Sequence, residues 1–104
     1  MSLSKISEKF VINKLKSIKN GNLKLINYDG NVYHFGDLES NLCANVQINN
    51  PKFYLNIILG GSSGLGEAHI NKDYYTTDLT NLIELSARNI NLIYEFSGSL
   101  KLQT

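Results

Sequence analysis

A helix that is apolar almost all the way round is the feature that most limits how this chain folds. Asn50-Pro51 supplies an N-cap and a proline at the first helical position, and Gly60-Gly61 ends the segment. Lys52 and Asn56 are four residues apart, so the polar positions form one narrow stripe. A helix lying on a sheet with its outer side in water does not need so much apolar surface. We therefore expect a second apolar cover, which is another helix, a partner protein or a lipid.

A basic amphipathic helix is predicted nearer the N-terminus, with Ser4 as its N-cap and Asn20-Gly21 as its stop. The apolar residues that recur at helical spacing are Ile6, Phe10, Val11, Leu15 and Ile18. The lysines that fall together on the opposite side are Lys5, Lys9, Lys16 and Lys19. This helix is the one local concentration of positive charge in a chain whose net charge is +1.

Alternating apolar and polar residues predict three strands between these two helices. Residues 22–28 and 31–35 flank Asp29-Gly30, which favours a hairpin with a two-residue connection of positive φ. Residues 42–48 alternate in the same way and extend the same face of the sheet.

The C-terminal half continues with short helices. Residues 62–70 predict a glycine-entered helix, and residues 73–75 an irregular or strand-like segment. Thr77 or Asp78 caps a further helix, which residues 89–91 interrupt before a second apolar turn. The whole pattern predicts an α+β fold, with a small, mainly antiparallel sheet covered on one face by helices.

Length and composition restrict the classes of function. At 104 residues the chain is expected to be a single domain, 1–104. A net charge of +1 argues against generic nucleic-acid binding. Cys43 is the only cysteine, so an intramolecular disulfide is impossible, and we interpret its thiol as filling the core. The sequence contains no apolar run of membrane-spanning length, which favours a cytoplasmic protein that contacts membranes only peripherally, at the inner membrane face.

Residues 46–79 resemble the N-terminal domain of cyclopropane-fatty-acyl-phospholipid synthases, which are S-adenosylmethionine-dependent lipid methyltransferases. The resemblance rests on an apolar helix begun by proline, a glycine pair and the string GLGEA, and it extends over about residues 7–96. The matching residues are Ile48, Pro51, Lys52, Phe53, Ile58, Leu59, Gly60, Gly61, Gly64, Leu65, Gly66, Glu67, Ala68, Asp73, Asp78 and Leu79. Three residues depart from the family pattern: His69, Lys72 and Tyr74 stand where tyrosine, glycine and tryptophan are usual.

The resemblance implies a lipid-binding accessory domain that presents phospholipid acyl chains to a catalytic domain outside this chain. In that enzyme a methylene group from S-adenosylmethionine is added across a cis double bond. The cofactor is expected only in the catalytic domain, and this chain is not expected to be an enzyme. The order of helix, glycine pair, short helix and strand is also similar to sterol-carrier-protein-2-like domains, which bind acyl chains between a sheet and its helices.

The candidate lipid-binding residues are Phe53, Tyr54, Ile57, Ile58, Leu65, Tyr74 and Tyr75. The candidate membrane contacts are Lys5, Lys9, Lys16 and Lys19, for which a simple solvated face is the alternative. Gly64, Gly66 and Glu67 form the most recognisable motif. The glycines follow a helix and fit neither nucleotide-binding spacing, so C-capping and close helix packing are the simplest interpretation. Glu67 is expected to cap a helix that starts at Gly64, to bind a lipid headgroup or to contact the catalytic domain outside this chain, and capping is the simplest of the three.

No catalytic residue and no metal site are predicted, because His34 and His69 are far apart in sequence and neither has metal-ligand spacing. Two other functions stay open. One is a protein–protein interaction or homodimerisation module whose apolar helices contact no lipid. The other is a free-standing lipid carrier.

Overall fold

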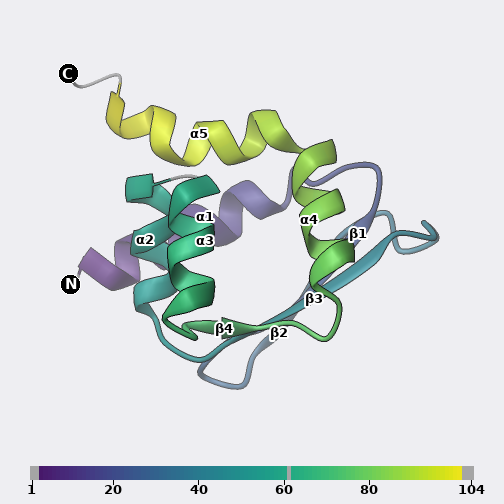
Figure 1. Ribbon diagram of the computed structural model, residues 1–104, viewed down its shortest axis with the longest axis horizontal. Coiled ribbons are helices and arrows are strands. Elements are labelled where there is room, and N and C mark those ends of the chain that lie inside the picture. Colours follow the sequence, from purple (N-terminus) through teal and green to yellow (C-terminus); the bar gives the residue numbers. More distant parts are fainter. Residues whose placement is uncertain (1–2, 61, 102–104) are drawn as a thin grey trace.

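The computed structural model describes residues 3–60 and 62–101, and Figure 1 shows the arrangement of their elements. The elements in chain order are α1 (Leu3–Leu15), β1 (Asn22–Ile26), β2 (Val32–Gly36), β3 (Cys43–Ile48), α2 (Lys52–Gly60), α3 (Ser62–Ile70), β4 (Tyr74–Tyr75), α4 (Leu79–Arg88) and α5 (Ile90–Lys101). The α+β class predicted from the sequence is confirmed.

The strands form one mixed sheet in the order β2-β1-β3-β4. β1 pairs antiparallel with β2 and parallel with β3, and β4 pairs antiparallel with the end of β3. Two of the three pairings are therefore antiparallel, as expected, but the central one is parallel. The connection from β2 to β3 crosses over β1, so β3 lies on the other side of β1 and runs parallel to it.

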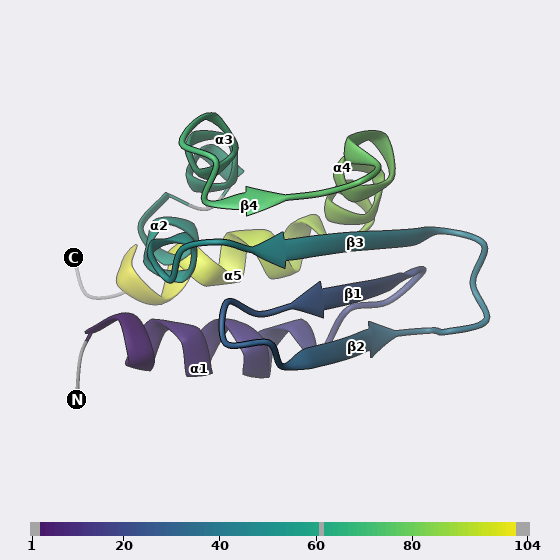
Figure 2. The same cartoon turned by 90° about the horizontal axis from the view of Figure 1, so that it is seen from below.

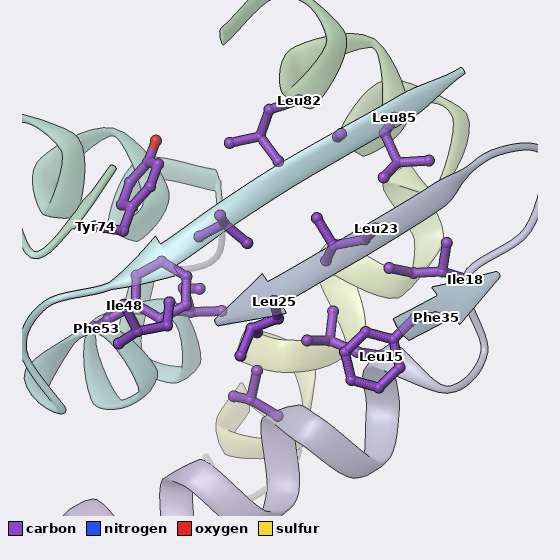
Figure 3. Packing of buried hydrophobic residues seen from close by; sticks show 14 of the residues in the cluster. Leu15, Ile18, Leu23, Leu25, Phe35, Ile48, Phe53, Tyr74, Leu82 and Leu85 are labelled. Carbon is purple, nitrogen blue, oxygen red and sulfur yellow. The ribbon is translucent and has the colours of Figure 1, made fainter. Parts of the chain in front are cut away.

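One face of the sheet carries the core and the other is open. Leu23, Leu25, Phe35, Val46 and Ile48 point to the covered face and are buried. Figure 3 shows several of these side chains meeting Leu15 from α1 and Leu82 and Leu85 from α4. Figures 1 and 2 show the helices gathered on that side. The alternation of apolar and polar residues in each strand produces this division.

The apolar helix α2 is covered by other helices of the same chain. It packs against α1, α3 and α5, and its Phe53, Tyr54, Ile57 and Ile58 are buried. Asn50 caps its start through a bond from the Lys52 N–H to Oδ1 at 3.0 Å. The sequence left open whether another helix, a partner protein or a lipid covers the second apolar side of α2, and in the structure other helices cover it. At the end of α2, Leu59 is 62% exposed.

The first helix differs from its prediction in three ways. It includes Leu3, so Ser4 lies inside the helix and is not its N-cap. It ends at Leu15, earlier than the predicted stop at Asn20-Gly21. Turns stabilised by backbone hydrogen bonds from the Ser17 and Ile18 N–H groups follow, and Asn20 then has a positive φ. Ile6 is 51% exposed, because the buried side is centred on Val11 and Leu15 rather than on Phe10.

The hairpin between β1 and β2 is correctly located, but its turn is longer than predicted. The Asn27 N–H donates to the Asn31 carbonyl and the Gly30 N–H to the Asn27 carbonyl, which leaves a three-residue loop. Gly30 has a φ of 90°, whereas the φ of Asp29 is not positive. This is the loop class in which one glycine in the left-handed region completes the turn.

The last two helices are separated by a side-chain clamp. Asp78 caps α4 by accepting a hydrogen bond from the Asn81 N–H, as predicted. Asn89 ends α4, and its carboxamide accepts from the Lys19 N–H and donates to the Lys19 carbonyl, both at 2.9 Å. The Arg88 guanidinium donates to the neighbouring carbonyl of Asn20. The corner between α4 and α5 is thereby fastened to the segment between α1 and β1.

Candidate functional site

An apolar cavity of about 60 Å³ lies between the sheet and the helices. It is lined mainly by aliphatic and aromatic side chains from α1, β1, β3, α2, α4 and α5: Val11, Leu15, Ile18, Leu23, Leu25, Val46, Phe53, Ile57, Leu82, Leu85, Ser86, Asn89, Leu92, Ile93 and Phe96. Apolar cavities of this kind stay dry. Its volume is well below the ~150 Å³ of an engineered apolar cavity that holds benzene. The core as packed in this structure therefore has no room for an acyl chain.

The structure brings only part of the candidate lipid-binding set to this cavity. Phe53 and Ile57 line it. Ile58 is buried outside the lining, while Tyr74 packs edge-on against Phe53 with ring centroids 5.3 Å apart. Tyr75 follows Tyr74 in β4 and therefore points to the open face of the sheet, where it is 57% exposed.

Tyr54, another member of that set, belongs to a buried polar network. It is completely buried, and its hydroxyl donates to Asn27 Oδ1 at 2.5 Å. Asn27 in turn donates from Nδ2 to Glu8 at 3.1 Å, and Tyr28 donates to the other Glu8 oxygen at 2.6 Å. Burial, and then the nearby Glu8 carboxylate, raise the pKa of the Tyr54 hydroxyl above its ordinary value. The remaining member of the set, Leu65, has a side chain outside the described residues.

The Glu8 network joins three elements and sets the rotation of α1. Glu8 comes from α1, Asn27 and Tyr28 from the hairpin loop, and Tyr54 from α2. Interaction with the Tyr28 hydroxyl, and then the charge of Glu8, raise the pKa of the Lys5 ammonium, which keeps Lys5 charged. This network could not be predicted from the sequence, because a glutamate between lysines, such as Glu8, is typical of an exposed helical face.

Three of the four candidate membrane contacts share the outer side of α1. Lys5, Lys9 and Lys16 are exposed there, and Lys16 belongs to the turn that follows the helix. Lys19 lies apart from them, where its backbone is held by Asn89. We call this surface the basic face of α1 and define it by Lys5, Lys9 and Lys16.

A broad groove of about 620 Å³ runs beside the basic face. Its lining combines two of the lysines with apolar, aromatic and polar side chains: Glu8, Lys9, Phe10, Ile12, Asn13, Lys16 and Tyr33. Leu3 and Ile6 on the same helix are more than half exposed. Cationic and apolar groups are thus both accessible on this side of the molecule.

The glycine motif has a structural role at Gly64. A Cβ there would lie 2.0 Å from the Asn56 carbonyl oxygen, so only glycine allows α3 to pack this closely on α2. At Gly66 an added Cβ would meet nothing within 4 Å. Glu67 is exposed, and its expected capping role is wrong, because α3 already begins at Ser62; its contact with a headgroup or a catalytic domain stays a prediction. The other glycine of the pair before α3, Gly61, lies outside the described residues.

Cys43 is exposed, so the expectation that its thiol fills the core is wrong. Strand alternation explains the error, because Ala44 and Val46 take the core side and leave Cys43 on the open face. Its sulfur instead contacts the Asn22 carboxamide at 3.3 Å and the Ser40 carbonyl at 3.4 Å.

Within residues 3–60 and 62–101, no group of three or more His, Cys, Asp or Glu side chains is arranged to hold a metal ion. None of the helices in the same ranges is long and apolar enough to cross a bilayer. Comparisons with protein-family models, curated proteins and solved structures gave no significant match. The resemblances to the synthase and sterol-carrier domains therefore stay predictions.

Proposed function

We propose that this chain is a lipid-binding accessory domain that associates peripherally with anionic membranes. The observation that carries the proposal is the basic face of α1, where Lys5, Lys9 and Lys16 are exposed, together with the exposed apolar side chains of Leu3 and Ile6 on the same helix. Lysines at a membrane surface are attracted to anionic headgroups, and neighbouring apolar side chains enter the boundary between headgroups and acyl chains.

The attachment of α1 to the rest of the domain supports this role. Val11 and Leu15 are buried in the core, and Glu8 accepts hydrogen bonds from Asn27 and Tyr28. The helix therefore docks on the bilayer without leaving the core, and it brings the whole domain with it.

In this proposal the domain serves a methyltransferase of the cyclopropane-fatty-acid-synthase kind, whose chemistry belongs to a catalytic domain outside this chain. The support is the GLGEA resemblance together with the apolar cavity beside Phe53 and Ile57. Because the cavity measures only about 60 Å³, an acyl chain enters only if the helices separate from the sheet. Contact of α1 with the bilayer is the event that we expect to favour this opening.

The test is sedimentation with phospholipid vesicles. We expect the protein to bind vesicles that contain phosphatidylglycerol and to bind pure phosphatidylcholine vesicles much more weakly, with added salt reducing the difference. The double variant Lys9→Glu, Lys16→Glu should lose at least tenfold in binding. The charge-matched control Lys24→Glu, Lys52→Glu changes exposed lysines outside the basic face of α1 and should bind like the wild type.

Equal binding to neutral and anionic vesicles would contradict the proposal, as would equal losses in the two double variants. The second candidate, an interaction module, is favoured by exposed apolar side chains on α4 and α5, with Ile83 58% and Tyr94 61% exposed. Absence of vesicle binding, together with a dimer in sedimentation velocity that Ile83→Asp dissociates, would select that function.

A further inference from the structure

The open face of the sheet holds a further pocket, of about 290 Å³, in which Tyr75 is the only member of the candidate lipid-binding set. Its lining combines one aromatic ring with a cation, two carboxamides, a hydroxyl and aliphatic side chains: Lys24, Ile26, Asn45, Val46, Gln47, Tyr75 and Thr77. This volume is just below the ~300–1,000 Å³ typical of small-molecule sites.

The strand register places these side chains in one continuous array. Gln47 pairs with Tyr75 on one side and with Ile26 on the other. Lys24 precedes Ile26 by two residues, so both point to the same face. The tyrosine ring and the lysine amino group therefore stand at opposite ends of the array, with Ile26 and Gln47 between them.

One wall of the pocket is fixed by hydrogen bonds. The Thr77 N–H donates to Asn45 Oδ1 at 3.1 Å, and Asn45 Nδ2 donates to Thr77 Oγ1 at 2.5 Å. Both ends of the Asn45 carboxamide are thereby engaged in holding the segment after β4 against β3. In the part of the chain that the structure describes, Lys24 and Gln47 have no such engagement with another side chain.

The chemistry of the array specifies its ligand. The exposed Tyr75 ring offers a flat surface for stacking, and the Gln47 carboxamide offers both a donor and an acceptor to the edge of a ring. Lys24 offers a positive charge, with His34 as its cross-strand neighbour. Among the strands that the structure describes, no residue on this face is acidic.

We propose that this pocket binds a planar heteroaromatic ring that carries an anionic group, the chemistry of a nucleoside monophosphate. The ring stacks on Tyr75, its polar edge meets Gln47, and the phosphate lies at Lys24. Stacking of a base on an aromatic side chain is a large and sequence-tolerant contribution to nucleotide binding. The site is independent of the basic face of α1, which belongs to another side of the molecule.

The test is a titration of the ¹⁵N-labelled protein with adenosine monophosphate, followed by NMR. We expect saturable shifts at Lys24, Ile26, Gln47 and Tyr75. Tyr75→Ala and Lys24→Ala should each weaken binding at least tenfold, while Tyr75→Phe keeps the ring and should bind within about twofold of the wild type. Adenosine and ribose 5-phosphate, which lack the anion and the base respectively, should each bind at least tenfold more weakly.

All substituted side chains are exposed, so unchanged melting temperatures will verify that each variant is folded. Absence of saturable shifts at millimolar adenosine monophosphate would overturn the proposal. So would shifts confined to α1, or binding that Tyr75→Ala leaves unchanged. Ribose 5-phosphate binding as well as the nucleotide would show that only the charge is recognised, which would also overturn it.

Discussion

At the scale of single residues, two glycines of the same motif have opposite surroundings. Gly64 faces the backbone of Asn56, where a Cβ has no room, whereas Gly66 faces open space. Both are helical positions of α3. Within the motif GLGEA, close packing therefore requires glycine at position 64, whereas any helix-forming residue would fit at position 66.

Alanine substitutions should separate these two positions. Gly64→Ala forces α3 away from α2 and should lower the free energy of unfolding by roughly 1–3 kcal/mol, as overpacking does. Gly66→Ala should raise it by roughly 0.5–1 kcal/mol, because alanine is the better helix former. Urea unfolding of both variants checks this. Equal effects on stability would mean that α3 and α2 are not closely packed at Asn56.

At the scale of elements, the sequence predicted most helices and strands because their periodicity is local. Asn50-Pro51 and Asp78 marked the starts of α2 and α4, and the alternation in residues 42–48 marked β3. The parallel pairing of β1 with β3 was missed, since register between distant strands leaves no local pattern. The exposure of Ile6 was missed because the buried Glu8 rotates α1, and a helical wheel treats a glutamate as solvent-facing.

The candidate sites were predictable to a lesser extent. The lysine spacing correctly placed Lys5 and Lys9 on the exposed side of α1, because helix geometry alone sets that side, whereas Lys16 and Lys19 of the same stripe lie beyond the end of the helix. The aromatic residues gave less information, since Tyr74 and Tyr75 are adjacent and a strand sends them to opposite faces. Strand alternation would also have placed Lys24 and Gln47 on the same face of the sheet as Tyr75, once the order of strands was known.

The cavity between the sheet and the helices leads to a prediction about the packing of these layers. Val46 lines the cavity, and Val46→Ile adds one methylene to it. The free energy of unfolding should rise by roughly 0.5–1 kcal/mol and the melting temperature by several degrees. Val32→Ile, on the exposed end of β2, is the matched control and should change little. A loss of stability in Val46→Ile would show that the walls do not accept the added group.

At the scale of the whole molecule, buried tyrosines link stability to alkaline pH. Burial raises the pKa of Tyr54 and of Tyr74 above their ordinary values, and the hydrogen bond to Glu8 raises that of Tyr28. A raised folded pKa means that folding favours the neutral phenol. The stability from this preference is complete below the unfolded pKa, about 10, and is lost as the pH rises above it.

Urea unfolding between pH 7 and pH 11 should therefore show constant stability at first and a decline above about pH 10. Each buried tyrosine contributes a slope of up to about 1.4 kcal/mol per pH unit. Tyr54→Phe should reduce the slope, and at pH 7 it should cost roughly 1–3 kcal/mol because Asn27 Oδ1 loses its donor. An unaltered alkaline slope in this variant would assign the effect to other groups.

The clamp made by Asn89 has a consequence for hydrogen exchange. The Asn89 side chain hydrogen-bonds both the N–H and the carbonyl of Lys19, as the backbone of a paired strand does. The Lys19 amide should therefore exchange slowly with solvent although its surroundings are exposed, and it should open together with the amides at the corner of α4 and α5. Two segments seventy residues apart in sequence thus form one cooperative unit of local unfolding.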